Sequence, residues 1–317
     1  MGDARQPDCR HRFLIDSCDV RGTLVRLDDT WQNAASRSDY PPNVRALLGE
    51  AFVAASLIVS TIKFRGRLTL QLRGPGSVHM LVVQVSNEGE LRGLARWQSV
   101  PDSTALAIAF GEDARMIIAI ERDGQQPWQG IVPLAGDTLA DALVAWFRTS
   151  EQLETDIHLQ CRETGAEGLL LQRLPFDQRI SGDDDGWTRA TRLAATLTGE
   201  ELASLDAATL LTRLYHEERV RLFEAEPLRF RCRCSAERTD NMLIGLGEHE
   251  VRDILAEEGR VEITCEFCDA VYRYDAVDIE ALFKGAETHP ETAADPMAAA
   301  PAPEDDAAAA ADAPTRH

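Results

Sequence analysis

Four cysteines in two close pairs are the residues of this chain that are best suited to chemistry. Cys232 and Cys234 form a C-x-C pair, and Cys265 and Cys268 form a C-x-x-C pair after an interval of thirty residues. Four thiolates are a complete ligand set for a tetrahedral structural Zn²⁺ ion, with Zn–S distances of about 2.3 Å. The combined spacing therefore predicts one closed zinc site made by these four side chains.

The same spacing leaves open whether the site is only a structural staple or also a redox switch. In an extended strand, residues i and i+2 have Cα atoms about 6.6–6.8 Å apart, which is the upper limit of about 6.8 Å for a disulfide. We expect Cys232 and Cys234 to lie in a strand with both sulfurs on one face, so a disulfide between them requires a local bend. Because the four sulfurs cannot bind zinc and be paired as disulfides together, oxidation would remove the metal. On spacing alone, the staple and the switch stay about equally open.

Zinc loss is expected to unfold the segment that carries these thiols. Structural zinc contributes about 10–16 kcal/mol in small peptides, whereas a whole domain is stable by about 5–15 kcal/mol. Residues 231–284 are near the lower size limit for a core that needs no metal. Arg231 and Arg233 flank the C-x-C pair, and we expect them to favour the thiolate and its reaction with oxidants.

The other three cysteines stand alone in the sequence. Cys9, Cys18 and Cys161 have no second cysteine at metal-ligand spacing, so we interpret them as small apolar residues. Enzyme motifs also fail: "HEERV" at His216 and "HEVRD" at His249 each lack the second histidine of a zinc-protease helix. We therefore expect no catalytic residues and no enzyme.

Composition narrows the class of protein further. The chain has 317 residues and a net charge of −20, which disfavours nucleic acid and anionic membranes as partners. Its N-terminus lacks the apolar region of a signal peptide, and we find no run of about 18 apolar residues that would span a membrane. We expect a cytoplasmic protein, in which paired cysteines more often bind metal or do redox work than form structural disulfides.

The elements that must position the thiols predict an α+β protein. Residues 1–178 combine short β-rich runs such as "RLTLQL" and "HMLVVQV" with helices from Pro42 to about Ile62 and from Asp137 to about Gln152. This pattern predicts a core domain of mixed sheets and helices.

Three further segments follow. Residues 179–230 predict an amphipathic helical linker, whose apolar face must be covered by a neighbouring element. We expect the zinc domain to provide this cover. Residues 231–284 predict a small zinc domain with four cysteine ligands, a helix over about 248–258 and a hairpin in "VEITCEFCDAVYRY". Residues 285–317, rich in Ala, Pro, Asp and Glu, predict a disordered acidic tail.

These pieces together resemble a known family. The stretches "YPPNVRALLGEAFVAASLIVSTIKFRGRLTLQLRGPG", "QGIVPLAGDTLADALVAWFRTSEQLETDIHL", "RLYHEERVRLF" and "FRCRCSAER…CEFCDAVYRYD" are similar to the 33-kDa heat-shock protein family of redox-regulated chaperones. The resemblance covers nearly all of residues 12–284 and excludes the tail.

The resemblance implies an ATP-independent holdase that is inactive while reduced and bound to one Zn²⁺. Oxidation would release the zinc and form disulfides Cys232–Cys234 and Cys265–Cys268. The zinc domain and linker would then unfold, unfolded client proteins would bind, and the oxidised protein would tend to dimerise. The resemblance gives the tail no role.

Two other functions remain as alternatives. A thiol–disulfide oxidoreductase could use Cys265 and Cys268, but thioredoxin-like C-x-x-C sites belong to a βαβ setting, whereas this motif is predicted to lie in a hairpin. A zinc-ribbon nucleic-acid module is the other alternative. It is disfavoured because residues 231–284 contain 7 basic against 13 acidic residues, a local net charge of −6.

Overall fold

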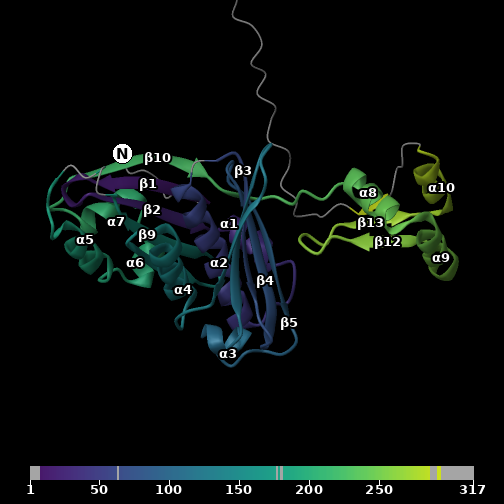
Figure 1. The fold of residues 1–317 in the computed structure, drawn as a ribbon, viewed down its shortest axis with the longest axis horizontal. Coiled ribbons are helices and arrows are strands. Elements are labelled where there is room, and N and C mark those ends of the chain that lie inside the picture. The colour runs from purple at the N-terminus through teal and green to yellow at the C-terminus, as the bar shows by residue number, and fades with distance from the viewer. Residues whose placement is uncertain (1–7, 63, 176–177, 179–180, 286–290, 294–317) are drawn as a thin grey trace, which may run out of the picture.

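The computed structural model describes residues 8–62, 64–175, 178, 181–285 and 291–293. Two sheets form the larger body, and a smaller module lies at one end of the molecule (Figure 1). Strands and helices are mixed without a regular βαβ repeat, so the α+β prediction is confirmed. The tail residues 286–290 and 294–317, expected to be disordered, lie outside the described residues.

The first sheet is antiparallel and has the strand order β10-β1-β2-β9-β8. Its strands are β1 (Cys9–Ile15), β2 (Val20–Leu27), β8 (Thr155–Cys161), β9 (Ala166–Arg173) and β10 (Val220–Pro227). The second sheet has the order β11-β5-β4-β3-β6-β7, with β11 parallel to β5. Its strands are β3 (Gly66–Arg73), β4 (Val78–Ser86), β5 (Glu90–Trp97), β6 (Arg115–Arg122), β7 (Trp128–Pro133) and β11 (Arg229–Phe230).

Helix α2 (Pro42–Thr61) is the centre of the larger body, and its expected bounds are confirmed. Proline at the first helical position suits this start, and the helix packs against strands of both sheets. By length and composition α2 could cross a membrane, which our search for apolar runs did not anticipate. However, 72% of its most apolar window is buried inside the protein, as expected for a core helix between two sheets.

Shorter helices complete the larger body. They are η1 (Asp16–Cys18), α1 (Asp29–Ala35), α3 (Leu106–Phe110), α4 (Leu139–Trp146), the π-helical turn η2 (Phe147–Glu151), α5 (Gly186–Ala194), α6 (Gly199–Ser204) and α7 (Ala207–Leu214). Together, α4 and η2 account for the helix expected from Asp137 to about Gln152. Thr138 begins α4 with a capping box that involves Asp141.

Successive side chains of the first sheet point to opposite faces, and each face packs against a different apolar core. On β9, Leu170 faces the cluster around α2, whereas Leu169 and Leu171 face a second cluster. That second cluster contains the apolar residues of α5–α7, including Leu210 and Leu214. The amphipathic helices expected in residues 179–230 are therefore covered by the first sheet.

Two expectations about residues 179–230 were wrong. The segment is not helical throughout, because Val220–Pro227 forms edge strand β10, which pairs with β1. Most of its side chains are exposed, so backbone pairing determines this strand and the apolar pattern carries little signal. We also expected the zinc domain to cover the apolar face of the helices, but the first sheet does so, and the smaller module lies at the other end of the molecule (Figure 1).

We call residues 231–285 together with β14 the C-terminal module. It contains α8 (Ala236–Leu246), α9 (Glu248–Glu258), α10 (Ala276–Lys284) and a sheet of β12 (Val261–Thr264), β13 (Val271–Tyr274) and β14 (Glu291–Ala293). The expected helix and hairpin are confirmed as α9 and β12–β13. Two features were missed: α8, and the pairing of β14, which lies in the segment expected to be disordered.

Candidate metal centre

The two cysteine pairs are held by different elements. Cys232 and Cys234 follow β11, whose pairing with β5 is extended by a hydrogen bond from Arg231 N to Leu91 O of 2.9 Å. This segment runs outside any strand, so the prediction that the C-x-C pair lies in a strand was wrong. Cys265 and Cys268 lie in the turn of the β12–β13 hairpin, as predicted.

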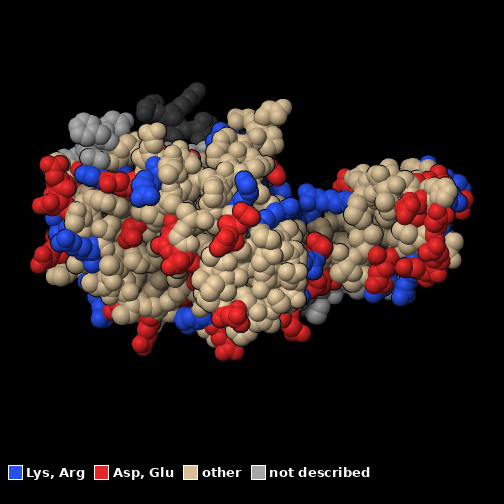
Figure 2. Space-filling model, turned by 60° about the horizontal axis from the view of Figure 1, so that its bottom comes forward, with Lys and Arg blue, Asp and Glu red and all other residues tan. Residues whose placement is uncertain are grey.

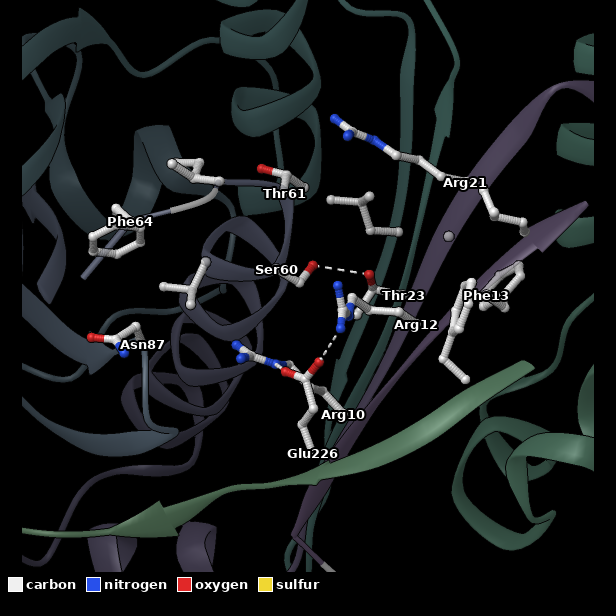
Figure 3. Close-up of a pocket in the computed structure, with 16 residues that line it drawn as sticks. Arg10, Arg12, Phe13, Arg21, Thr23, Ser60, Thr61, Phe64, Asn87 and Glu226 are labelled. Atoms are coloured by element: carbon white, nitrogen blue, oxygen red, sulfur yellow. Dashed lines mark hydrogen bonds and ion pairs between the residues drawn. The ribbon is translucent and has the colours of Figure 1, made fainter. Parts of the chain in front are cut away.

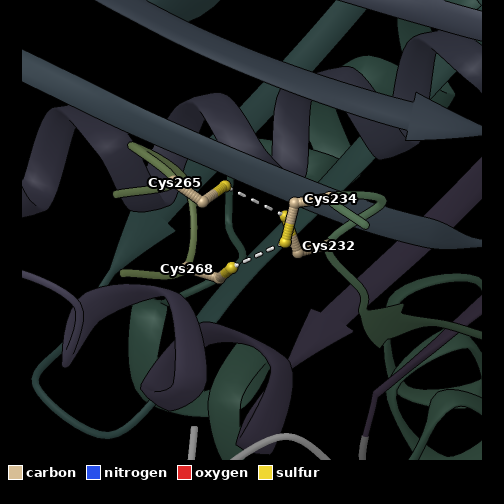
Figure 4. A group of neighbouring side chains, drawn as sticks. All are labelled: Cys232, Cys234, Cys265 and Cys268. Atoms are coloured by element: carbon tan, nitrogen blue, oxygen red, sulfur yellow. Dashed lines mark hydrogen bonds between the residues drawn. The ribbon is translucent and has the colours of Figure 1, made fainter. Parts of the chain in front are cut away.

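Backbone hydrogen bonds shape the turn that carries the C-x-x-C pair. Cys265 N donates to Ala270 O at 2.9 Å, and Asp269 N donates to Cys265 O at 2.8 Å. Asp269 adopts a left-handed conformation with φ of 56°, which aspartate tolerates better than most residues. The closed turn brings both thiols to one side of the hairpin (Figure 4).

The four sulfur atoms form one compact cluster. All lie within 4.8 Å of one another, with 3.6 Å between the Sγ atoms of Cys232 and Cys265 and 3.3 Å between those of Cys234 and Cys268 (Figure 4). A tetrahedron with metal–sulfur bonds of about 2.3 Å has sulfur–sulfur edges of about 3.8 Å. The donor set thus fits a tetrahedral metal ion, and the structure brings together all four residues that the sequence singled out.

Hydrogen bonding among the thiols separates their pKa values. The thiols of Cys234, Cys265 and Cys268 interact with Cys232 and hold its pKa far below the ordinary value. The same contacts raise the pKa of Cys265 and Cys268. Contact with Cys232 raises the pKa of Cys234, but contacts with Cys265 and Cys268 outweigh it and lower this pKa to about 6. The two sulfurs of the C-x-C pair therefore favour the thiolate while those of the C-x-x-C pair keep their protons, and a divalent cation in the centre would remove this competition.

Arginines of the larger body surround the cluster. Arg92 on β5 donates from Nη1 to Cys232 Sγ at 3.7 Å, and its guanidinium lies 4.3 Å from the centroid of the Phe267 ring. Arg37, which follows α1, donates to Cys268 O at 3.2 Å. Figure 2 shows basic side chains gathered at the neck between the larger body and the C-terminal module. A Zn²⁺ ion with four thiolates carries a charge of −2, which these cations would partly balance.

One of the two arginines that the sequence suggested is directed away from the thiols, and the role expected of Arg233 stays a prediction. Arg231 directs its guanidinium to Glu90 Oε1 at 2.7 Å, and no motif or spacing in the sequence links Arg92 to Cys232. The signal that could have identified Arg92 is the pairing of β11 with β5, which is a tertiary contact.

The three isolated cysteines lie largely inside the larger body, and two of them have polar neighbours: Arg189 Nη2 lies 3.5 Å from Cys18 Sγ, and Cys161 Sγ lies 3.8 Å from Arg45 O. Cys9 and Cys18 are buried and Cys161 is half-buried. Burial raises the pKa of Cys9 and of Cys18 to about 11 and that of Cys161 to about 12. They are therefore protonated near neutral pH, in agreement with their interpretation as small apolar residues.

The fold and the site define an α+β protein whose C-terminal four-cysteine cluster can hold a metal ion. The family model for "Hsp33 protein" matches residues 8–275, and the chain belongs to the Hsp33 family.

Relatives named "33 kDa chaperonin" support this assignment. One from Pseudomonas fluorescens is 45% identical over 293 residues, covering 90% of this chain and 97% of the relative. Another, from Nitrosococcus oceani, is 44% identical over 276 residues, covering 87% and 94%. The crystal structure of a Thermotoga maritima Hsp33 homologue, also titled 33 kDa chaperonin, superposes with a TM-score of 0.76 and covers 88% of this chain and 98% of that one. At 21% identity, it supports the fold alone.

Proposed function

We propose that this protein is a redox-regulated, ATP-independent chaperone of the cytoplasm that holds unfolding client proteins during oxidative stress. Membership of the Hsp33 family and the chaperonin names of the relatives support a chaperone. The reduced protein binds one Zn²⁺ through Cys232, Cys234, Cys265 and Cys268 and is inactive. Oxidation releases the metal, and the oxidised protein dimerises.

The observation that carries the proposal is the convergence of two distant cysteine pairs on one cluster. The apolar core of the C-terminal module is small. Its buried members are Leu243, Val251, Val261, Tyr272, Tyr274, Ile279 and Leu282. Zinc would join the segment after β11 to the β12–β13 turn. The free energy of binding a structural zinc ion is as large as the free energy of unfolding of a typical domain. Removal of the metal would therefore unfold the module.

The redox step is a four-electron oxidation by two molecules of hydrogen peroxide. Each peroxide accepts two electrons from two thiolates and two protons from solvent, forming one disulfide and two water molecules, and two peroxides leave Zn²⁺ without ligands. We propose the pairs Cys232–Cys234 and Cys265–Cys268. The sulfur–sulfur contacts of 3.6 Å and 3.3 Å join one pair to the other, so the proposed pairing requires the segments to separate as zinc leaves.

Client binding would use apolar surface released by this unfolding. The functional divisions are a core of residues 1–178, a linker of 179–230 and a switch of 231–284. Met242, Ile244 and Leu246 on α8 are already about half exposed, and loss of the module adds its buried residues to this surface. Exposed apolar patches of this kind bind unfolded proteins. The linker is tied to the switch through β10 and β11, whose pairing would weaken when the module unfolds.

Aggregation of a heated client tests this function. We expect the peroxide-treated protein to suppress light scattering and the reduced, zinc-loaded protein to leave it unchanged. A Cys265→Ser variant should lose this redox dependence, whereas Cys161→Ser should retain it because Cys161 lies outside the cluster. Equal suppression by reduced and oxidised wild-type protein would rule out the switch.

The oxidoreductase alternative has less support in the geometry. Cys265 and Cys268 lie in a hairpin turn, and not at a helix N-terminus that would stabilise a reactive thiolate. Turnover in an insulin-reduction assay, lost in Cys265→Ser, would reverse this preference.

A further inference from the structure

A cavity of about 570 Å³ lies beyond the C-terminal end of α2, over strands β1, β2 and β10 (Figure 3). Its volume falls in the range of about 300–1,000 Å³ that is typical of small-molecule sites. It lies in the larger body and contains none of the four clustered cysteines. Its lining has a basic side and an apolar side. The basic side indicates the charge of a ligand, and the apolar side indicates the character of the rest of the ligand.

The basic side comes from the register of two strands. In the β1–β2 pair, Arg12 lies opposite Thr23 and Arg10 lies opposite Val25, and Val25 belongs to the core around α2. Arg10 and Arg12 are therefore on the inward face of the sheet, where an apolar residue is the ordinary choice. The cavity lies where α2 has ended, and these arginines line the space that the helix leaves.

The positive charge in the cavity exceeds its negative charge. Among the described residues, three arginines and one glutamate line it, for a net charge of +2 from these side chains in a chain whose net charge is −20. Glu226 binds Arg10 Nε at 2.5 Å and Arg12 Nη2 at 2.6 Å. Figure 3 shows these two arginines around the Glu226 carboxylate. One carboxylate is thus shared between two guanidinium groups.

Two of these guanidinium groups retain hydrogen-bonding capacity. Arg10 is 7% exposed, and its Nη1 atom is buried with no hydrogen-bond partner among the described residues. Such an unpaired buried donor is costly and uncommon in native proteins. Arg21 donates from Nε and Nη2 to Gln172 Oε1, at 3.0 Å and 2.7 Å, and this partner is neutral. An anion in the cavity would supply the missing acceptors.

The remaining walls are largely apolar. Val59, Ile62, Phe64, Leu170 and Phe223 contribute them, whereas Phe13, which also borders the cavity, is 1% exposed and belongs to the second core cluster. The carbonyl end of α2, at Ser60 and Thr61, carries partial negative charge and repels an anion. The head group of a ligand therefore belongs beside the arginines, and its apolar body belongs beside the phenylalanines.

We propose that this cavity binds an amphipathic organic anion, with a carboxylate or phosphate head held by Arg10, Arg12 and Arg21 and an apolar body held by the phenylalanine walls. The site does not depend on the zinc cluster or on the chaperone function. Phe223 and Glu226 belong to β10, so the ligand would bridge this edge strand to β1, β2 and the residues after α2.

Calorimetric titration of the reduced, zinc-loaded full-length protein tests the site. The probes are decanoate, decyl phosphate, 1-decanol and inorganic phosphate, each below its micellar concentration. We expect at least one of the two amphipathic anions to bind at 1:1 stoichiometry, and the tighter of them identifies the head group. Decanol and inorganic phosphate should each bind at least about tenfold more weakly, because each lacks one of the two recognised parts.

Variants connect the binding to these residues. Arg21→Gln should weaken anion binding by roughly tenfold, and Phe223→Ala should weaken it without any change of charge. Arg148→Gln, an exposed position on η2, is the matched control and should bind as wild type. If Arg21→Gln does not fold, as judged by circular dichroism, Arg12→Gln replaces it. The proposal is overturned by absence of anion binding up to millimolar concentration, by equal binding of decanol, by equal binding of inorganic phosphate, or by unchanged affinity in the variants.

Discussion

At the scale of single residues, the four cysteines could be identified from the sequence because their spacing is itself the signal. Cys232, Cys234, Cys265 and Cys268 belong to two local motifs, and the structure brings their sulfurs within 4.8 Å. Arg92 could not be identified, because it approaches Cys232 only after β5 and β11 pair. Contacts of this kind depend on tertiary structure, and a single sequence carries no record of them.

Arg92 is expected to slow metal loss. In Arg92→Gln, we expect zinc to dissociate roughly tenfold faster or more, because groups that contact metal ligands commonly change affinity by about 10–100-fold. Transfer of zinc to a coloured chelator measures the rate. Arg96→Gln is the control, since Arg96 forms an exposed ion pair with Glu266 and such pairs contribute little. Equal rates in wild type and Arg92→Gln would show that Arg92 is not involved.

The isolated thiols are expected to resist alkylation. A thiol with a pKa of about 11, as for Cys9 and Cys18, is only about 0.1% thiolate at pH 8. Brief iodoacetamide treatment of the folded protein, followed by mass spectrometry, should leave both unmodified, while urea-unfolded protein reacts at both. Because burial raises these pKa values, reactivity in the folded state should rise only as the pH approaches about 11. Rapid modification at pH 8 would contradict the burial argument.

At the scale of elements, helices and strands were predicted correctly where a buried face gives the sequence a regular spacing of apolar residues. They were missed where most side chains are exposed and no such spacing exists. Helix α2 has a fully developed apolar pattern and a proline at its start, and the β12–β13 hairpin has turn residues between β-rich runs. Strand β10 exposes most of its side chains, and α8 exposes Met242, Ile244 and Leu246. Neither element shows a clear periodic pattern in the sequence.

Glu50 on α2 should make the larger body less stable at high pH. Burial raises the pKa of Glu50 from 4.5 to about 7, so its contribution to stability is fully present below pH 4.5 and is lost as pH rises through about 7. The loss amounts to at most about 3 kcal/mol. Urea unfolding at pH 5.5 and pH 8 should show that Glu50→Gln is more stable than wild type chiefly at pH 8. A pH-independent difference between the two proteins would argue against a raised pKa.

The small core of the C-terminal module should control zinc retention. Leu243 on α8 is fully buried, and Leu243→Ala should cost about 2–5 kcal/mol. We expect this variant to release zinc at a lower temperature than wild type. Leu246→Ala, at a position that is 51% exposed on the same helix, should behave as wild type. Identical release temperatures for Leu243→Ala and wild type would show that zinc retention does not depend on the apolar core of the module.

At the scale of the whole molecule, the structure changes how the zinc cluster would act on the linker. The apolar faces of α5–α7 pack on the first sheet, whereas the cluster joins the segment after β11 to the β12–β13 turn of the C-terminal module, which lies at the other end of the molecule (Figure 1). A structural change caused by metal release would therefore reach the linker along the chain, through β11 and β10, and through the contacts of Arg37 and Arg92. Sequence patterns could predict that the helices are amphipathic, but not which neighbour covers them.

The central claim is that metal release and thiol oxidation are one event. Zinc release and thiol loss, measured together during peroxide treatment, test it most directly, with disulfides mapped by mass spectrometry at the end. The account predicts that one Zn²⁺ leaves as four thiols disappear, giving Cys232–Cys234 and Cys265–Cys268. Zinc that stays bound while these four thiols are oxidised, or zinc that leaves with all four still reduced, would contradict it.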